Sequence, residues 1–310
     1  MKSILITGAF GYVGGRLSKY LSESGQYQLF LTSRKKRDLP LWTNGAQLVQ
    51  YCLGNKKDIF ASLPSIDVAI HLASINEVMC SKSPELAVEL NTVASFKLIQ
   101  DAVKAGVKRF VYFSTAHVYG SPLKGYFDEE SVTRPTHPYS YSHRAVEDYV
   151  TTANDQGKME GVNIRLSNSL GAPDEKDVDR WMLLVSDLCR QAVVEGSLEL
   201  KSYGSQKRDF IGLEDVCRGT EHLINLQEIG NGVFNLGGNY SISVYDMACL
   251  IAERASHILG KEIPVVRPEG KTENWELEYS VKKLESTGFE LKKNVQQEID
   301  NLLLFCQQSF

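Results

Sequence analysis

The sequence contains little that would cross-link the chain or hold it in a membrane. Its six cysteines are scattered without a Cys-x-x-Cys pair, which predicts reduced thiols and neither a disulfide framework nor a zinc site. No run of 18 apolar residues occurs, so we expect no membrane span. The first apolar stretch, residues 4–6, is too short for the core of a secretory signal. We therefore expect a cytoplasmic protein without a metal ion.

An excess of positive charge is also lacking. The 34 Lys and Arg residues are outnumbered by 38 Asp and Glu residues, for a net charge of −4, which argues against nucleic acid as a partner. Repeats, low-complexity tracts and Pro/Gly/Ser-rich linkers are absent as well. With 310 residues, 43% of them apolar, the chain can build a sizeable core in one large domain or two closely packed ones.

Short apolar runs alternate with amphipathic stretches in the first half of the chain. Residues 4–6, 29–32, 68–72 and 110–113 are expected strands, and residues 12–24 form an expected helix that ends at Gly25. A second helix is predicted from a Ser83 cap and Pro84 to Gly106. This alternation predicts an α/β fold with a doubly wound parallel (Rossmann) sheet. After about residue 166 the alternation loosens, with a helix expected at 181–194, which predicts a smaller C-terminal lobe.

Three glycines follow the first predicted strand. Gly8, Gly11 and Gly14 stand where the strand gives way to a helix. A glycine turn at this junction lets the backbone approach a pyrophosphate, which the helix N-terminus then binds. The pattern predicts a dinucleotide site.

The end of the second strand indicates which dinucleotide is bound. An NAD enzyme usually has an acidic residue there, whereas this strand runs into Ser33, Arg34 and Lys35. A hydroxyl and a guanidinium suit a 2′-phosphate. NADP(H) is favoured and NAD(H) is possible; a solvated basic loop is the alternative interpretation.

Several motifs together resemble the extended short-chain dehydrogenase/reductase family, in particular its nucleotide-sugar epimerase/dehydratase group. They are the Gly-x-x-Gly-x-x-Gly turn and the segments at residues 54–55, 67–74, 109–120, 138–147, 165–173, 200–211 and 233–238. The resemblance implies a dinucleotide-binding domain at 1–166 with a return segment at about 209–238, and a substrate-binding lobe at 167–208 and 239–310. It also implies a homodimer formed through the helices near 84–105 and 137–156.

The resemblance assigns a set of cofactor contacts. Those residues are Gly8, Phe10, Gly11, Tyr12, Val13, Gly14, Ser33, Arg34, Asn55, Leu72, Ala73, Ser74, Asn91, Tyr139 and His143. Asn55 stands where the family usually has an aspartate.

The same register assigns the catalytic groups. Thr115 is the catalytic hydroxyl and Tyr139 the catalytic tyrosine, but His143 replaces the lysine four residues later. A free tyrosine has a pKa of about 10, and the family's lysine favours the phenolate. Histidine, with an ordinary pKa of about 6.5, does so less. Alcohol oxidation needs the phenolate and carbonyl reduction needs the phenol, so the substitution favours a reductase.

The resemblance also implies a nucleoside-diphosphate sugar as substrate. Its expected contacts are Ser114, His117, Asn168 and Arg208, with Arg208 on the diphosphate. Ala116 and His117 replace the acidic pair that dehydratases use, so 4,6-dehydration is not expected. We expect an NADPH-dependent reductase of a 4-keto sugar nucleotide. A 4-epimerase and a non-catalytic dinucleotide-binding sensor or scaffold remain alternatives.

Overall fold

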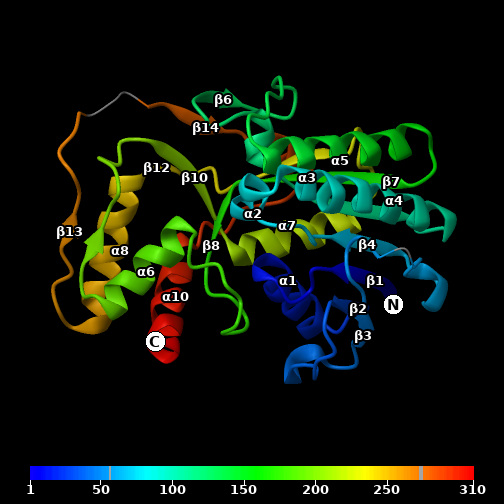
Figure 1. Cartoon of the computed structure of the whole chain (residues 1–310), viewed down its shortest axis with the longest axis horizontal. Coiled ribbons are helices and arrows are strands. Elements are labelled where there is room, and N and C mark those ends of the chain that lie inside the picture. Colours follow the sequence, from blue (N-terminus) through cyan, green and yellow to red (C-terminus); the bar gives the residue numbers. More distant parts are fainter. Residues whose placement is uncertain (56, 272–274) are drawn as a thin grey trace.

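The computed structural model describes residues 1–55, 57–271 and 275–310. The chain folds into two parts that lie side by side, a sheet covered by helices and a smaller group of helices and short strands (Figure 1). The C-terminal helix belongs to the smaller part.

A seven-stranded parallel sheet is the frame of the larger part. Its spatial order is β11-β7-β5-β4-β1-β2-β3, and its strands are β1 (Lys2–Thr7), β2 (Tyr27–Ser33), β3 (Gln47–Gln50), β4 (Val68–His71), β5 (Arg109–Thr115), β7 (Glu160–Leu166) and β11 (Val233–Leu236). The order reverses between β1 and β4, and ligands bind in such sheets beyond the carboxyl ends of the strands at that point. The predicted α/β fold with a doubly wound sheet is confirmed.

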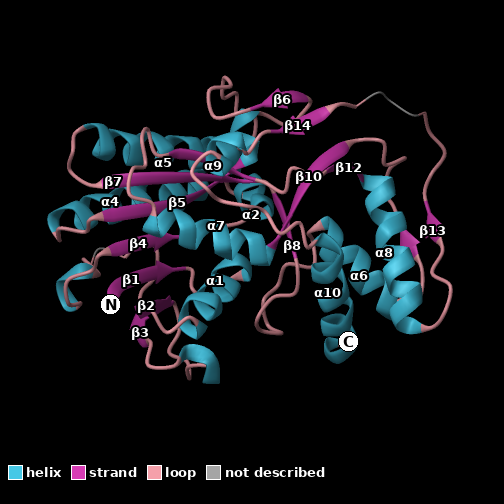
Figure 2. Ribbon diagram, turned by 180° about the vertical axis from the view of Figure 1, so that it is seen from behind, coloured by secondary structure: helices cyan, strands magenta, loops and turns pink. Residues whose placement is uncertain are grey.

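Helices cover both faces of this sheet (Figure 2). One face carries α1 (Tyr12–Glu23) and α7 (Leu213–Asn225). The other carries α4 (Ala94–Lys104) and α5 (Pro138–Asp155). Around them lie the shorter helices α2 (Glu77–Lys82), α3 (Pro84–Leu86) and α9 (Lys282–Glu285), a π-helical segment Ala87–Val93, and a strand pair of β6 (Gly125–Phe127) and β14 (Leu277–Tyr279).

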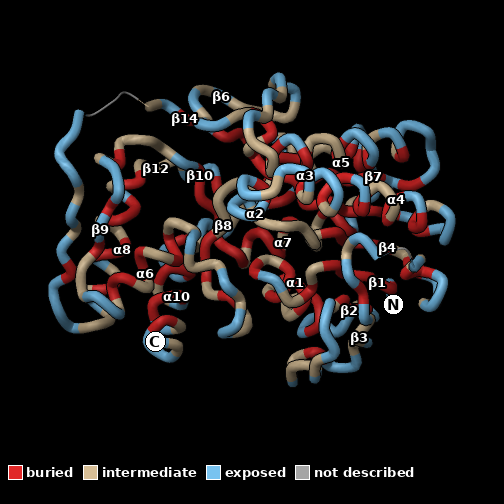
Figure 3. The backbone as a smooth tube through the Cα atoms, viewed as in Figure 1, coloured by how far each residue is buried: buried red, intermediate tan, exposed pale blue. Residues whose placement is uncertain are grey.

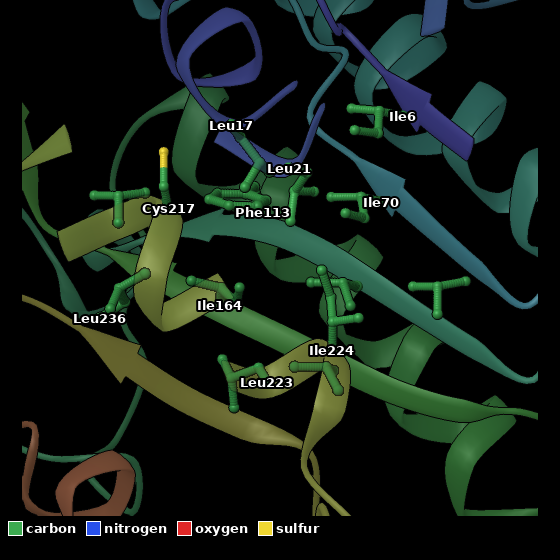
Figure 4. Packing of buried hydrophobic residues seen from close by; sticks show 14 of the residues in the cluster. Ile6, Leu17, Leu21, Ile70, Phe113, Ile164, Cys217, Leu223, Ile224 and Leu236 are labelled. Carbon is green, nitrogen blue, oxygen red and sulfur yellow. The ribbon is translucent and has the colours of Figure 1, made fainter. Parts of the chain in front are cut away.

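Side chains alternate between the two faces, as strand geometry requires. Ile4 and Ile6 lie in the core under α1 and α7, whereas Leu5 lies in the core under α4 and α5. Figure 4 shows the first of these cores, where Leu17, Leu21 and Phe113 meet residues of α7 and of the central strands. Because both faces are buried, the strands are continuous apolar runs.

The smaller part has a core of its own. It contains α6 (Leu184–Val194), α8 (Val244–Leu259) and α10 (Val295–Ser309), with the short sheets β12-β10-β8 and β13-β9. The strands are β8 (Asn168–Leu170), β9 (Leu198–Glu199), β10 (Lys207–Gly212), β12 (Ser241–Ser243) and β13 (Val265–Val266). Figure 3 shows buried backbone in both parts of the molecule. The domain boundaries drawn from the resemblance stay a prediction.

Some local expectations were wrong. The helix predicted from residue 181 begins at Leu184, because Trp181 turns into the core of the smaller part and contacts Phe305 and Phe310. Ser83 makes no side-chain cap, and the helix predicted from it contains a π-helical stretch. The edge strand β3 was missed, since its four residues are not fully buried and carry little apolar signal. In the described part of the chain no helix is long and apolar enough to cross a membrane.

Candidate active site at the carboxyl edge of the sheet

The glycine turn after β1 is packed against backbone on two sides. Gly8 has a φ of +72°, and a Cβ there would lie 2.9 Å from the amide nitrogen of Ala73. A Cβ on Gly14 would lie 2.1 Å from the carbonyl oxygen of Gly8. The turn is closed by a hydrogen bond of 2.9 Å from the Gly11 amide to the Gly8 carbonyl. Only glycine fits these two positions, and the close packing brings the amino end of α1 to the strand end.

The first turn of α1 is open toward this edge. Gly11 is the N-cap, it is exposed, and it provides no side-chain cap. Unpaired amides at a helix N-terminus bind phosphate, so the turn fits a dinucleotide pyrophosphate. Phe10 and Val13 are half-buried beside it. Tyr12 is buried and donates a 3.0 Å hydrogen bond to the carbonyl of Gly171, so its side chain joins the two parts of the protein.

The basic residues after β2 differ in what their side chains contact. The Ser33 hydroxyl donates to the carbonyl of Lys35 at 2.7 Å, and Arg34 is exposed. Arg37 lies 4.1 Å from the ring centroid of Phe10 and binds Glu175 at 2.6 Å. Arg34 is therefore accessible to solvent, whereas Arg37 is already paired with a carboxylate from the smaller part.

Buried polar side chains fix the loop after β4. His71 bonds to Thr7 at 2.6 Å and to Ser95 at 2.8 Å, and burial lowers its pKa to about 3. Leu72, Ala73 and Ser74 follow it and are half-buried. His71 was not among the predicted site residues, although a polar residue inside an apolar strand is a signal of such a buried contact.

Two asparagines from the cofactor set lie in different surroundings. Asn91 is buried in the π-helical segment, accepts from the amide of Ile75 at 2.9 Å and donates to Ser142 at 3.3 Å. It therefore ties the loop after β4 to α5. Asn55 is exposed in a turn, where its side-chain oxygen accepts from the amide of Lys57.

The predicted hydroxyls lie at the end of β5. Thr115 is buried, and its Oγ1 accepts from the amide of His117 at 3.2 Å. Ser114 Oγ and His117 Nδ1 are buried without a hydrogen-bond partner among residues 1–55, 57–271 and 275–310. Burial lowers the pKa of His117, which is therefore neutral near pH 7. Buried polar atoms without partners are uncommon in proteins, so their presence here fits a bound ligand.

Tyr139 lies on the first turn of α5, which a capping box at His137 and Ser140 fixes in place. Its side chain is half-buried. Burial raises the pKa of its phenol to about 12, and the charge of Arg180 opposes that rise. Glu77 and Cys80 reinforce the rise. The phenol is therefore protonated at neutral pH.

His143 lies beneath Tyr139, with ring centroids 4.3 Å apart. Its Nδ1 is 2.6 Å from the hydroxyl of Tyr112, whose pKa is raised well above 10 by burial. Since Tyr112 keeps its hydrogen and has Nδ1 as its partner, we infer that it donates to Nδ1 and that Nε2 carries the imidazole hydrogen. Burial lowers the pKa of His143 to about 4, although the Phe113 backbone opposes this. His143 is thus a neutral donor.

Two of the predicted substrate residues, Asn168 and Arg208, lie on strands of the smaller part. Asn168 on β8 donates to the carbonyl of Asp209 at 2.9 Å, which leaves its oxygen available. Arg208 on β10 is solvent-exposed, yet surrounding protein lowers its pKa, and Glu77 opposes that shift. Sequence reasoning missed Glu77, the residue after the Asn76 cap of α2, whose charge acts on Tyr139, His117 and Arg208.

No cluster of three potential metal ligands occurs in the described part of the chain. A doubly wound sheet with an uncapped glycine turn at its switch point defines an α/β protein of the kind that binds a dinucleotide. The model of the NAD dependent epimerase/dehydratase family matches residues 4–237, and the chain belongs to that family of enzymes. The resemblance to the extended short-chain dehydrogenase/reductase family is confirmed.

Two relatives show how far the sequence similarity extends. The chain is 27% identical over 288 residues to a dTDP-D-glucose 4,6-dehydratase of Mus musculus, covering 88% of this chain and 76% of that one. It is 26% identical over 283 residues to a UDP-glucose 4-epimerase of Halalkalibacterium halodurans, with 84% and 83% covered.

Solved structures support the fold. MoeE5 in complex with UDP-glucuronic acid and NAD matches with a TM-score of 0.81 at 24% identity, covering 99% of this chain and 100% of that one. RMD from Pseudomonas aeruginosa complexed with NADPH matches with a TM-score of 0.79 at 21% identity, and both chains are covered completely.

Proposed function

We propose that this protein is an NADPH-dependent reductase of a 4-keto sugar attached to a nucleoside diphosphate. The observation that carries the proposal is the pairing of a protonated Tyr139, whose phenol pKa is raised to about 12, with a neutral His143. A carbonyl reduction needs a proton donor, whereas an alcohol oxidation needs a base. A protonated Tyr139 is a proton donor, so the site favours carbonyl reduction.

The chain's own groups have distinct parts in this chemistry. A bound nicotinamide dinucleotide supplies the hydride. Tyr139 gives its phenolic proton to the substrate oxygen and regains it from solvent. Thr115 holds the same oxygen through its hydroxyl. His143 offers its Nε2–H as a hydrogen-bond donor within the site. The hydrogen bond between its Nδ1 and the Tyr112 hydroxyl holds the ring in place.

The cofactor is assigned to NADPH on the residues at the end of β2. Arg34 is exposed, and no hydrogen bond or ion pair of its side chain occurs among the described residues. Together with Ser33 it provides donors for a 2′-phosphate. The pyrophosphate is held by the Gly8, Gly11 and Gly14 turn, and the remaining contacts come from the loop after β4.

The substrate assignment rests on Arg208 and on the relatives. An exposed guanidinium with two parallel N–H donors suits a diphosphate, and the relatives carry names of enzymes that act on dTDP- and UDP-linked sugars. Ser114 and His117 offer partnerless buried atoms to the sugar, and Asn168 offers its side-chain oxygen. Dehydration is disfavoured because Ala116 and His117 stand where an acid and base would be needed.

The test is NADPH consumption with a set of 4-keto sugar nucleotides. The wild-type protein is expected to oxidise NADPH with at least one of them, and Tyr139→Phe to lower kcat by about 100-fold or more. Tyr141→Phe, on the same helix but exposed, serves as the matched control and should retain activity. No consumption with any substrate would overturn the proposal.

A 4-epimerase is the second candidate, favoured by the similarity to UDP-glucose 4-epimerase. An epimerase of this type oxidises and then reduces its substrate, so it must keep its cofactor between the two steps. Denaturing the purified protein and assaying the supernatant for NAD(H) separates the two functions. Stoichiometric NAD(H) with conversion of a UDP-hexose to its 4-epimer would replace the reductase assignment.

A further inference from the structure

Helix α5 is capped by a histidine that bonds to the backbone of Tyr139. His137 is the N-cap, and its Nδ1 accepts a 3.2 Å hydrogen bond from the amide of Tyr139. The amide of His137 in turn donates to the Ser140 hydroxyl at 3.2 Å, which completes the capping box. The first four amides of a helix have no partner within the helix, so the Tyr139 amide depends on this imidazole.

A histidine can cap a helix in this way only while Nδ1 carries no hydrogen. Ser, Thr, Asp and Asn are the usual caps, because their side-chain oxygens accept without such a condition. In a neutral imidazole one nitrogen accepts and the other donates, so we assign the hydrogen of His137 to Nε2. Nε2 lies 2.6 Å from the hydroxyl oxygen of Ser81 and donates to it. Ser81 thus favours the form of His137 that holds Tyr139.

Ser81 lies on α2, the short helix that follows the loop after β4. This helix is anchored at the buried Cys80, whose Sγ donates to the carbonyl of Ile75 at 3.6 Å and accepts from Asn91 at 3.4 Å. Ser81 itself is exposed, so its hydroxyl is not needed to fill a core. The loop that is expected to contact the cofactor therefore leads directly into the element that bonds the cap of α5.

The position of Tyr139 matters because a proton donor must lie about 2.6–3.2 Å from the atom that it protonates. A displacement of about 1 Å can lower the rate about 100-fold. The Tyr139 ring packs against His143, with ring centroids 4.3 Å apart, which restrains the side chain and not the backbone. Tyr139 is the second residue of α5, and helix ends fray. The cap supplies the restraint on the backbone.

We propose that Ser81 and His137 form a positioning pair for Tyr139. Ser81 orients the imidazole and keeps its hydrogen on Nε2, and the imidazole holds the backbone of Tyr139 through Nδ1. Both residues act through Tyr139, as positioning residues. The inference rests on the proposed role of Tyr139 as proton donor, and it adds a connection from the loop after β4 to that donor.

The first measurement needs no substrate. The protein is labelled with 3-fluorotyrosine, and the Tyr139 resonance in the ¹⁹F NMR spectrum is identified as the one missing from Tyr139→Phe. Ser81→Ala should move this resonance by more than its linewidth, because the imidazole loses its partner. Ser81→Thr keeps the hydroxyl and should leave the resonance in place. Ser83→Ala is the matched control, since Ser83 lies two residues further along and its side chain caps no helix.

A second background separates the pair from a general effect of α2. His137→Asn keeps a side-chain oxygen that caps the helix, but its shorter side chain does not extend to Ser81. In the His137→Asn background, Ser81→Ala should therefore leave the Tyr139 resonance in place. The two substitutions are coupled in this way only if Ser81 acts through the imidazole.

The kinetic measurement separates kcat from KM in the NADPH assay with a 4-keto sugar nucleotide. Ser81→Ala is expected to lower kcat about three- to tenfold, the fold-change that corresponds to one lost hydrogen bond. KM for the sugar nucleotide should change less than about twofold, because substrate binding in the ground state is not altered. His137→Asn should retain kcat within about threefold of the wild type, since the cap is kept.

Three results would overturn the proposal: a Tyr139 resonance that stays in place in Ser81→Ala, an equal movement in Ser83→Ala, or a movement caused by Ser81→Ala in the His137→Asn background. An active Ser81→Ala enzyme with unchanged kcat would overturn it as well. Absence of reductase activity together with the expected NMR results would reject the proposed function and support the positioning pair, so the two failures are distinguishable.

Discussion

At the scale of single residues, Gly14 has the strictest steric requirement in the cofactor turn. A Cβ there would meet the Gly8 carbonyl oxygen at 2.1 Å, so Gly14→Ala must displace backbone. Overpacking costs about 1–3 kcal/mol, and about 1.4 kcal/mol changes a dissociation constant tenfold. We expect Gly14→Ala to weaken NADPH binding by about tenfold or more, measured by fluorescence titration.

Gly15 is the matched control for this substitution. A Cβ on Gly15 meets the Cβ of Asp174 at 3.5 Å, an ordinary contact. Gly15→Ala should keep NADPH affinity and gain helix propensity of up to about 1 kcal/mol. Equal loss of binding in both variants would contradict the steric explanation.

His143 makes stability depend on pH. Its pKa is lowered by burial to about 4 in the folded protein, against about 6.5 when unfolded. Between these values the unfolded state binds more protons, so the free energy of unfolding falls as pH decreases from 6.5 toward 4. The contribution lost between pH 7 and pH 5 is about 2 kcal/mol.

Urea denaturation at pH 7 and pH 5 checks this dependence. His143→Asn removes the titrating group and should show a smaller difference between the two pH values than the wild type. His257→Asn, which removes a histidine from the last turn of α8, is the control. His71 titrates in the same direction, so some dependence should persist. An undiminished difference in His143→Asn would refute the assignment.

At the scale of elements, one buried ion pair holds α5 on the sheet. Arg165 of β7 binds Glu147 of α5 at 2.8 Å, with side chains 6% and 1% exposed. Removing one partner of a buried pair leaves an uncompensated charge. Since α5 carries Tyr139 and His143, this pair also sets the position of the reacting groups.

Glu147→Gln should therefore lower the free energy of unfolding by about 3–5 kcal/mol, measured by urea denaturation. Asp148→Asn is the matched variant on the same helix. It breaks an exposed pair with Arg144 and should cost less than about 1 kcal/mol. Similar losses of unfolding free energy in the two variants would show that burial does not determine how much the Arg165–Glu147 pair contributes to stability.

At the scale of the whole molecule, the helices beside β5 and β7 leave apolar side chains in solvent. Val93 is 56% and Val88 46% exposed in the π-helical segment, and Tyr141 and Tyr149 are exposed on α5. The ring of Phe96 on α4 contacts that of Tyr149 at 4.3 Å, so the two elements present one surface. The homodimer expected through these helices stays a prediction, and this surface is where it should form.

Val93→Asp is expected to shift the wild-type dimer to monomer in sedimentation equilibrium, because it places a charge within the apolar surface. Leu41→Asp changes an apolar residue that is even more exposed and lies outside these helices, and it should leave the dimer intact. A monomeric wild-type protein, or a dimeric Val93→Asp, would contradict the expectation.

Local signals predicted the central strands and α1 well, since apolar runs and glycines act over a few residues. They predicted less where contacts between residues far apart in the sequence determine the local structure. The start of α6 depends on Trp181 packing against a helix more than 120 residues later in the sequence, α10. The π-helical segment depends on Asn91, which joins the loop after β4 to α5.

The sequence by itself determined the doubly wound sheet, the glycine turn, the family, and the presence of histidine where a lysine is usual. Only the tertiary structure decided that this histidine is buried under Tyr139, bonded to Tyr112 and neutral. The physical reason is that a motif contains only residues close together along the chain. The burial of a side chain and the charges around it depend on every element that packs against the site.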